Sequence, residues 1–329
     1  MTNETYLEIK NLSKHFNTRS KKQVLIAVND VSLRFPRGKT LGLIGESGSG
    51  KSTIGRCILR LTEPTGGEIL CEGQDLAKLS EKDFRKKWRP RMQMVFQDPF
   101  DSLNPRMNIR SLLLEPIRLA GTLAGRNPDE VVTELLRKVK LDPEMAKAYR
   151  HQLTPGQQQR VGIARAIATS PAFLVLDEPI SLLDISVRAE ILKILYEIQE
   201  SEGLTYLFIS HDLSTVQDFC HHVAVMYLGR IVETGTVDQV FSHPMHPYSK
   251  ALLQSVLYPD PSKRHQPSQL SGEIPSPINT PPGCPLHTRC PIATEACGKI
   301  TQSFTDMGDG HLVACMRAAN EKGGLDETL

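Results

Sequence analysis

The sequence predicts an α/β fold that carries its functional residues on loops directly after buried strands. An apolar run at 40–44 leads into a glycine-rich loop, and an apolar-faced helical pattern at 54–60 follows that loop. A second apolar run, 172–176, ends in two carboxylates, and a strand pattern at 204–209 ends in a Ser-His-Asp loop. Loops at the carboxyl edge of parallel strands are where α/β folds place ligand chemistry.

Length and composition indicate a globular protein with one large α/β domain and a smaller part. The 329 residues are 23% charged and 40% apolar, and the net charge of +2 does not favour nucleic acid as a partner. No apolar run approaches the roughly 18 residues of a membrane helix. Met1–Thr5 lacks the basic start of a signal peptide. We therefore expect a cytosolic chain that reaches a membrane only through a partner.

The loop after the first buried strand fits the pattern G-x-x-x-x-G-K-[ST]. Its glycines allow a bent backbone whose N–H groups point at a phosphate chain, and the next helix adds the positive end of its dipole. In such loops the lysine reaches the β- and γ-phosphates and the next hydroxyl binds Mg²⁺. The sequence therefore predicts a nucleoside triphosphate site formed by Gly45, Glu46, Ser47, Gly48, Ser49, Gly50, Lys51, Ser52 and Thr53.

Strand patterns dominate the first hundred residues. We expect strands, besides the one before the loop, at 6–10, 12–16, 24–28, 31–35, 68–73 and 93–96. The basic stretch 85–91 indicates a solvated face. The apolar alternation of these runs indicates that they pack one face on a common core.

The pattern changes after Gln97. Helices are expected at 109–119, 129–139 and 157–168, which places a helical insertion at about 100–168 within the core. Further on we expect a helix at 188–200, a strand at 204–209 and a hairpin of 222–228 with 229–234. We therefore predict a nucleotide-binding domain over 1–240 and an extension over 241–329, with a proline-rich linker or arm at 259–291.

The chain resembles the ATP-binding subunit of ABC transporters in four features and in their order. They are Gln97 after a strand, the stretch Leu153-Thr-Pro-Gly-Gln-Gln-Gln-Arg160, the strand ending in Asp177 and Glu178, and His211 at a strand end. The resemblance implies a P-loop NTPase core of the ABC ATPase type. It also implies an antiparallel β subdomain, a helical subdomain and a cysteine-containing C-terminal extension.

The resemblance implies how ATP and Mg²⁺ are held. Phe16 would stack a flat π-face on the adenine ring, with a core phenylalanine as the alternative. Ser52 and Gln97 would bind Mg²⁺ directly and Asp177 through water, because oxygen ligands suit this hard cation. The alternative for the carboxylates after 172–176 is a solvated loop.

The resemblance also implies the catalytic residues. Glu178 would polarise the attacking water, His211 would sense or stabilise the γ-phosphate, and Lys51 and Gln97 would complete the set. Little covalent chemistry is required, because phosphoryl transfer depends mainly on positioning and charge neutralisation.

The stretch after Leu153 is expected to act on a second subunit. In this family two ATPase domains face each other head to tail, and each caps the ATP bound to the other. Thr154, Gly156 and Gln157 would be the trans-acting residues. The resemblance further implies that closure on ATP drives the membrane subunits through a surface near Gln97.

Two departures from the family pattern surround these residues. The usual stretch is LSGGQ; here Thr154 adds a methyl group and Pro155 removes one N–H and favours extended backbone before it. Ile180 and Leu182 replace the usual Thr and Ala. We hypothesise that the composite site capped by this subunit's Thr154–Gln157 is weaker than the one capped by its partner.

Seven cysteines divide into two groups. Cys57, Cys71 and Cys220 stand alone in apolar segments, which indicates packed thiols. The second group, close together near the C-terminal end, favours metal or iron–sulfur binding over disulfides in a reducing compartment, although no C-x₂-C pair occurs. The resemblance implies a [4Fe–4S] cluster; zinc and packed or free thiols are the alternatives. This group is Cys284, Cys290, Cys297 and Cys315.

Local stretches resemble the dipeptide/oligopeptide permease branch, and within it the second ATPase subunit of dipeptide permeases. They are 97–106, His246-Pro-Tyr-Ser-Lys-Ala-Leu-Leu253, 271–277 and the interval 281–290. The branch implies an ATPase that powers import of di- or oligopeptides. Nickel, glutathione and antimicrobial-peptide systems, a soluble ABC ATPase acting on DNA or ribosomes, and a non-hydrolysing regulatory subunit are the alternatives.

The resemblance implies several partners for this subunit. They are a second ABC ATPase subunit (a heterodimer, with a homodimer as the alternative), two transmembrane permease subunits and, indirectly, an extracellular substrate-binding protein. No nucleic acid partner is expected. The expected location is the cytoplasmic face of the inner membrane.

Overall fold

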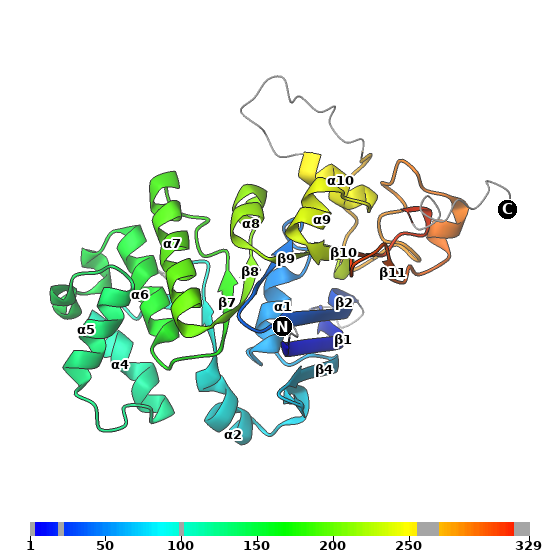
Figure 1. Cartoon of the computed structure of the whole chain (residues 1–329). Coiled ribbons are helices and arrows are strands. Elements are labelled where there is room, and N and C mark those ends of the chain that lie inside the picture. Colours follow the sequence, from blue (N-terminus) through cyan, green and yellow to red (C-terminus); the bar gives the residue numbers. More distant parts are fainter. Residues whose placement is uncertain (1–3, 19–22, 99–101, 255–269, 319–329) are drawn as a thin grey trace. The chain divides into compact units, whose positions relative to one another are not determined.

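The structure is a computed structural model and describes residues 4–18, 23–98, 102–254 and 270–318. The chain forms two compact units, each discontinuous in sequence, whose elements are labelled in Figure 1. Unit 1 is made of Met1–Leu7, Arg34–Thr40 and Cys71–Ser210, and unit 2 of Glu8–Leu33, Leu41–Leu70 and His211–Leu329. Segments of the two units therefore alternate along the sequence.

Unit 1 is built on three parallel strands: β6 (Met92–Val95), β7 (Phe173–Asp177) and β8 (Thr205–Ile209). In their register Val95 lies opposite Leu176, and Asp177 lies opposite Ile209. Every residue of β7 and β8 is buried, and apart from Asp177 at the end of β7 and Thr205 at the start of β8 both strands are apolar, as expected of parallel strands covered on both faces.

Helices of unit 1 follow the expected pattern closely. They are α4 (Ile109–Ala120), α5 (Pro128–Lys138), α6 (Pro155–Ile167) and α7 (Ile185–Glu202). The first three pack against one another (Figure 1). Their ends have local causes: Asn108 caps α4 by accepting the Ser111 N–H at 2.9 Å, and Gly121 ends it with φ +69°.

Short elements connect these strands and helices. They are β5 (Gln74–Asp75), η1 (Leu76–Lys78), α2 (Glu81–Asp83), the π-turn η2 (Phe84–Trp88), η3 (Arg89–Arg91), η4 (Pro143–Lys147) and η5 (Arg150–Gln152). The basic stretch is exposed at 85–87, as expected, but Trp88 within it is fully buried. The basic residues thus flank a tryptophan that packs in the interior.

Unit 2 holds most of β1 (Thr5–Asn17), β2 (Val24–Pro36) and β4 (Gly66–Cys71), which neighbour one another in the order β2-β1-β4. The sequence predicts two short strands within each of β1 and β2, and the structure shows one long strand in each case. Asn11 and Asp30 mark the expected breaks and have φ +51° and +57°. Asn and Asp tolerate this left-handed backbone, so the strand bends without ending.

A second sheet in unit 2 combines β3 (Thr40–Ile44) with strands from the C-terminal part. β9 (His222–Tyr227) is parallel to β3 and antiparallel to β10 (Arg230–Thr236). β12 (Leu312–Val313) pairs with β10, and β11 (Thr305–Asp306) pairs with β12. The extension therefore adds strands to the edge of the predicted hairpin.

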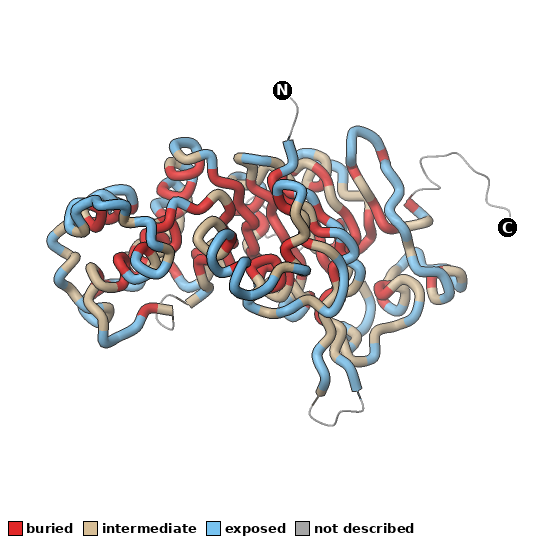
Figure 2. Tube along the Cα trace, turned by 90° about the horizontal axis from the view of Figure 1, so that it is seen from below, coloured by how far each residue is buried: buried red, intermediate tan, exposed pale blue. Residues whose placement is uncertain are grey.

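Helices of unit 2 are short. They are α1 (Lys51–Ile58), α8 (Leu213–Phe219), α9 (Val237–Ser242), α10 (Pro247–Gln254) and the 3₁₀ turn η7 (Glu295–Gly298). Buried positions follow the strands and the inner helix faces, and the connecting loops are mostly exposed (Figure 2). Residues 270–291 form neither helix nor strand, in line with the expected proline-rich arm; 255–269 lie outside the described residues.

Candidate nucleotide site

The phosphate loop of unit 2, Gly45–Thr53, joins β3 to α1. Two of its glycines are required by the backbone, with φ +147° at Gly45 and +107° at Gly50. A Cβ at these positions would lie 2.1 Å from the carbonyl oxygen of Met226 and 2.0 Å from that of Ala27. Any other residue would collide with a neighbouring strand, so only glycine allows the loop to follow this course.

Lys51 lies inside the loop that it belongs to. Its side chain is 6% exposed, and its Nζ donates to the carbonyl oxygens of Gly45 at 2.8 Å and Glu46 at 2.9 Å. Ser52 follows in the first turn of α1, which contains no acidic residue. The positive end of the helix is therefore not neutralised by its own first turn, which favours an anion at this place.

In unit 1 three predicted residues meet at the carboxyl ends of β6 and β7. Asp177, the last residue of β7, is 3% exposed, and Glu178 follows it. Gln97 donates from Nε2 to Oε2 of Glu178 at 2.9 Å. The strand register explains this contact, because Gln97 comes two residues after Val95 and Glu178 two residues after Leu176. The structure thus brings together two residues that are 81 positions apart.

The backbone at Glu178 is left-handed, with φ +47°. Its N–H donates to the carbonyl of Ile209 at 2.9 Å, and its carbonyl accepts the hydroxyl of Ser181 at 3.1 Å. A non-glycine residue held in this region by its surroundings is typical of functional sites. Ile180 is buried and Leu182 is 62% exposed, so only the first of the two departures contributes to packing.

The stretch after Leu153 begins α6. Thr154 is the N-cap: its hydroxyl accepts the Gln157 N–H at 3.3 Å, and Gln157 Oε1 accepts the Thr154 N–H at 3.0 Å. Pro155 occupies the first helical position, where its missing N–H costs the helix nothing. A Cβ on Gly156 would lie 2.7 Å from Cγ1 of Val187, so helix packing also favours glycine here.

Two further predicted residues lie at element ends. Phe16 stands near the end of β1 with 40% of its surface exposed, and Lys14 Nζ lies 4.9 Å from its ring centre. His211 is exposed in the loop between β8 and α8. An exposed aromatic ring at a strand end is compatible with stacking on a base.

Sequence reasoning missed two residues that contact the phosphate loop. The Glu46 N–H donates to the Tyr248 hydroxyl at 2.9 Å, and Arg289 Nη1 lies 3.6 Å from Oε2 of Glu46. Tyr248 belongs to the His-Pro-Tyr stretch that carried part of the resemblance. Arg289 belongs to the interval 281–290, which also carried part of the resemblance. Neither stretch indicated contact with the phosphate loop, whose Glu46 lies 202 residues before Tyr248.

The four C-terminal cysteines line one small pocket of about 20 Å³, together with His287. All seven cysteines of the chain are free thiols. Burial raises the pKa of Cys284 to about 11, and the other three nearby thiols add to this rise. Within the described residues no three His, Cys, Asp or Glu side chains are arranged to hold a metal ion. The structure therefore does not support the iron–sulfur assignment as it stands, although it gathers the expected thiols.

The isolated cysteines fit the packing prediction. Cys57 and Cys71 are buried, and Cys220 is half-buried. Burial raises the pKa of Cys57 and of Cys71 to about 11. Thiols with such pKa values stay protonated and unreactive at neutral pH.

Comparison with known families gives two separate matches along the chain. The family described as "ABC transporter" matches residues 28–181, and the family "Oligopeptide/dipeptide transporter, C-terminal region" matches residues 232–297. The second match includes the His-Pro-Tyr stretch and three of the four C-terminal cysteines.

Similar proteins span nearly the whole chain. The oligopeptide transport ATP-binding protein AppF of Bacillus subtilis (strain 168) is 46% identical over 321 residues, or 95% of this chain and 97% of that protein. The probable peptide ABC transporter ATP-binding protein y4tS of Sinorhizobium fredii is 45% identical over 317 residues, or 95% and 90%. Among solved structures, the dimeric post-hydrolysis state of the ATP-binding cassette MJ0796 with ADP and Pi matches with TM-score 0.64. It is 27% identical and covers 70% of this chain and 98% of that one.

The chain belongs to the ABC transporter family of ATP-binding proteins. The predicted fold class, an ABC ATPase core with a C-terminal extension, is confirmed, and so is the predicted class of enzyme, an ATP hydrolase of the ABC type.

Proposed function

We propose that this chain hydrolyses ATP to power the import of di- or oligopeptides. The observation that carries the proposal is the pair of family matches in one chain, an ABC transporter match at 28–181 and an oligopeptide/dipeptide transporter C-terminal match at 232–297. Relatives named for peptide and oligopeptide transport, at 45% and 46% identity over 95% of the chain, support it.

One group of residues in the proposed site binds ATP and Mg²⁺. Lys51 and the backbone of the phosphate loop bind the phosphates, and Phe16 stacks on the adenine. Ser52 and Gln97, with Asp177 through water, are the residues that would hold Mg²⁺, which supplies charge neutralisation when bound. Their oxygen-bearing side chains fit this cation.

Glu178 acts as the general base in this proposal. Its carboxylate is already oriented by the Gln97 amide at 2.9 Å, and the constrained backbone beneath it fixes its position. His211 completes the site by contacting the γ-phosphate. Thr154, Gly156 and Gln157 act on the ATP of a second subunit, where Pro155 supplies one N–H fewer than glycine would.

Two permease subunits and a second ABC ATPase subunit, different from this one, are the proposed partners, and an extracellular binding protein delivers the peptide. None of the helices within the described ranges combines the length and apolar character of a membrane span. We place the subunit on the cytoplasmic face of the membrane through its permease partners.

Reconstitution tests the substrate class. The chain is assembled in proteoliposomes with two permease subunits, a second ABC ATPase subunit and a substrate-binding protein. ATP hydrolysis is then measured with a dipeptide, a pentapeptide, Ni²⁺ or glutathione outside. We expect that only the peptides stimulate ATP hydrolysis. Stimulation by Ni²⁺ or glutathione alone would contradict peptide import.

The cysteine group carries a separate part of the proposal: Cys284, Cys290, Cys297 and Cys315 would hold a [4Fe–4S] cluster. The thiols share one pocket, but burial raises the pKa of Cys284 and of Cys290, so these two need a bound cation before they ionise. Within the described residues the thiols are not arranged as metal ligands. Anaerobic purification tests this. Brown protein with absorbance near 400 nm and bound iron supports the cluster; colourless, iron-free protein refutes it.

A further inference from the structure

The second residue of the phosphate loop, Glu46, is held from outside the loop at two places. Its backbone N–H donates to the Tyr248 hydroxyl at 2.9 Å, and its carboxylate forms an ion pair with Arg289 at 3.6 Å. Tyr248 lies at the start of α10, and Arg289 comes directly before Cys290. Both contacts lie within unit 2 and come from the part of the chain beyond residue 240.

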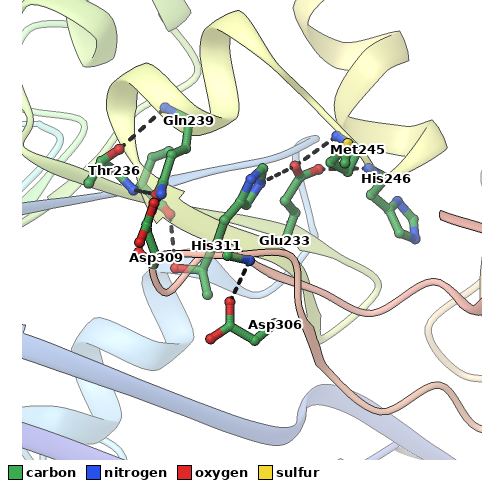
Figure 3. Close-up of polar contacts among 11 residues, drawn as sticks. Glu233, Thr236, Gln239, Met245, His246, Asp306, Asp309 and His311 are labelled. Carbon is green, nitrogen blue, oxygen red and sulfur yellow. Dashed lines mark hydrogen bonds and ion pairs between the residues drawn. The ribbon is translucent and has the colours of Figure 1, made fainter. Parts of the chain in front are cut away.

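Tyr248 is positioned by hydrogen bonds that begin on β10. Glu233 is fully buried there, and its carboxylate accepts the backbone N–H groups of Met245 and His246, each at 2.9 Å (Figure 3). His246 Nδ1 then accepts the Tyr248 N–H at 3.1 Å. These bonds connect the sheet, through the His-Pro-Tyr stretch, to the hydroxyl that contacts Glu46.

Residues of the C-terminal extension hold Glu233, from which these hydrogen bonds begin. His311, next to β12, contacts Glu233 from Nε2 at 2.7 Å, and Gln239 donates to the carbonyl of Asp309 at 3.3 Å (Figure 3). Burial by itself would raise the pKa of Glu233, but the hydrogen bonds from His311, Met245 and His246 hold it below its ordinary value. Glu233 therefore remains an ionised acceptor.

Arg289 and the tyrosines support one another around Glu46. Arg289 Nη1 donates to the Tyr227 hydroxyl at 3.3 Å. The rings of Tyr227 and Tyr248 lie with their centres 4.6 Å apart at 47°. Arg289 is 9% exposed and both tyrosines are 1% exposed, so these groups lie in an interior where their positions are fixed by packing.

We propose that Tyr248 and Arg289 are positioning residues that pre-organise the phosphate loop for ATP. Glu46 is also one of the two residues whose carbonyl oxygens hold the Lys51 ammonium. A shift of Glu46 therefore displaces the charge that meets the phosphates. The His-Pro-Tyr stretch has, in this account, the physical role of fixing that loop from the extension.

Without either contact the phosphate loop is less ordered before ATP binds. ATP must then order the loop on binding, which lowers its affinity. We expect Tyr248→Phe and Arg289→Met each to weaken binding of the non-hydrolysable analogue AMP-PNP by about tenfold, which corresponds to about 1.4 kcal/mol. Arg289→Lys keeps the charge and should recover part of the loss. In the assembled transporter the Michaelis constant for ATP should rise by the same factor, with kcat changed less than about twofold.

The experiment uses the full chain and titration calorimetry with Mg²⁺ and AMP-PNP. Tyr206→Phe is the matched control, because it removes a buried tyrosine hydroxyl that donates to the Leu195 carbonyl at 3.0 Å within unit 1. A general loss of stability would affect this control as much as Tyr248→Phe. If Tyr248→Phe does not fold, the two Arg289 variants carry the test.

The inference rests on ATP binding at this loop, so the wild-type chain is the reference. Failure of the wild type to bind AMP-PNP would refute the proposed function itself. Wild-type affinity in Tyr248→Phe and Arg289→Met, or an equal loss in Tyr206→Phe, would refute the positioning role alone. Weakened binding in both variants with an unaffected control supports it.

Discussion

Stability of unit 2 should depend on pH through His246. This side chain is 1% exposed, and burial lowers its pKa to about 4; Glu233 opposes the shift and Lys250 adds to it. At neutral pH the ring is therefore uncharged, which leaves Nδ1 free to accept the Tyr248 N–H at 3.1 Å. Substitution His246→Asn removes the titrating group and keeps an acceptor, because the amide oxygen occupies a similar position.

The sign and size follow from the two pKa values. Between the ordinary value of 6.5 and about 4 the unfolded chain binds a proton that the folded chain does not. Acid therefore favours unfolding in this window, and the stability present above pH 6.5 is lost as pH falls toward 4. At about 1.4 kcal/mol for each unit, the loss from His246 is about 3 kcal/mol.

Urea unfolding at pH 7.0, 6.0, 5.0 and 4.5, followed by far-ultraviolet circular dichroism, measures this loss. His246→Asn should be less stable than wild type at pH 7, because packing changes, but should lose less on acidification. His243→Asn makes the same substitution at an exposed histidine three residues earlier and is the matched control for the change of residue type. An unchanged slope in His246→Asn would show that His246 does not cause the loss of stability at low pH.

Two further substitutions test the loop and the helix start. Gly50→Ala should abolish ATP binding and cost about 2 kcal/mol or more in unfolding free energy, because its Cβ would lie 2.0 Å from the Ala27 carbonyl oxygen. Gly48→Ala, with φ +78° and open space around it, should cost only about 1 kcal/mol by urea unfolding; equal costs would contradict the packing argument. Pro155→Gly should lower stability by about 1 kcal/mol but raise the ATPase rate of the transporter. Pro128→Gly, at the start of α5, should show the stability loss alone, and an unchanged rate and ATP affinity in Pro155→Gly would end the weak-site hypothesis.

Local spacing accounts for what the sequence could predict. The phosphate loop and the carboxylates after 172–176 are recognisable because their chemistry lies within a few consecutive residues. The Gln97–Glu178 contact was accessible for a related reason: both residues follow parallel strands, whose carboxyl ends meet at one edge. The strand breaks expected at Asn11 and Asp30 were wrong, because these residues adopt left-handed backbone inside continuous strands.

Contacts between distant segments could not be predicted where the residues do not follow neighbouring parallel strands. Tyr248 reaches Glu46 across 202 residues, and the bond exists only because Glu233 and His246 fix the start of α10. For the cysteine group, the sequence predicted the proximity of the residues but not their geometry. The short separation of the four cysteines in the sequence predicted that they lie near one another. The arrangement of their thiols depends instead on backbone turns such as Gly283, where φ is +67° and a Cβ would lie 2.4 Å from the Cys297 carbonyl oxygen.

Single-turnover hydrolysis of ATP by the assembled transporter tests whether Glu178 is the base of an ATP-hydrolysing site. Glu178→Gln keeps the shape of the side chain and an oxygen that can still accept from Gln97, but removes the base. We expect the variant to bind ATP within a few-fold of wild type and to hydrolyse it more slowly by about a hundredfold or more. Equal rates for wild type and variant would contradict the assignment of Glu178, and absence of hydrolysis in the wild type would contradict an ATP-hydrolysing subunit.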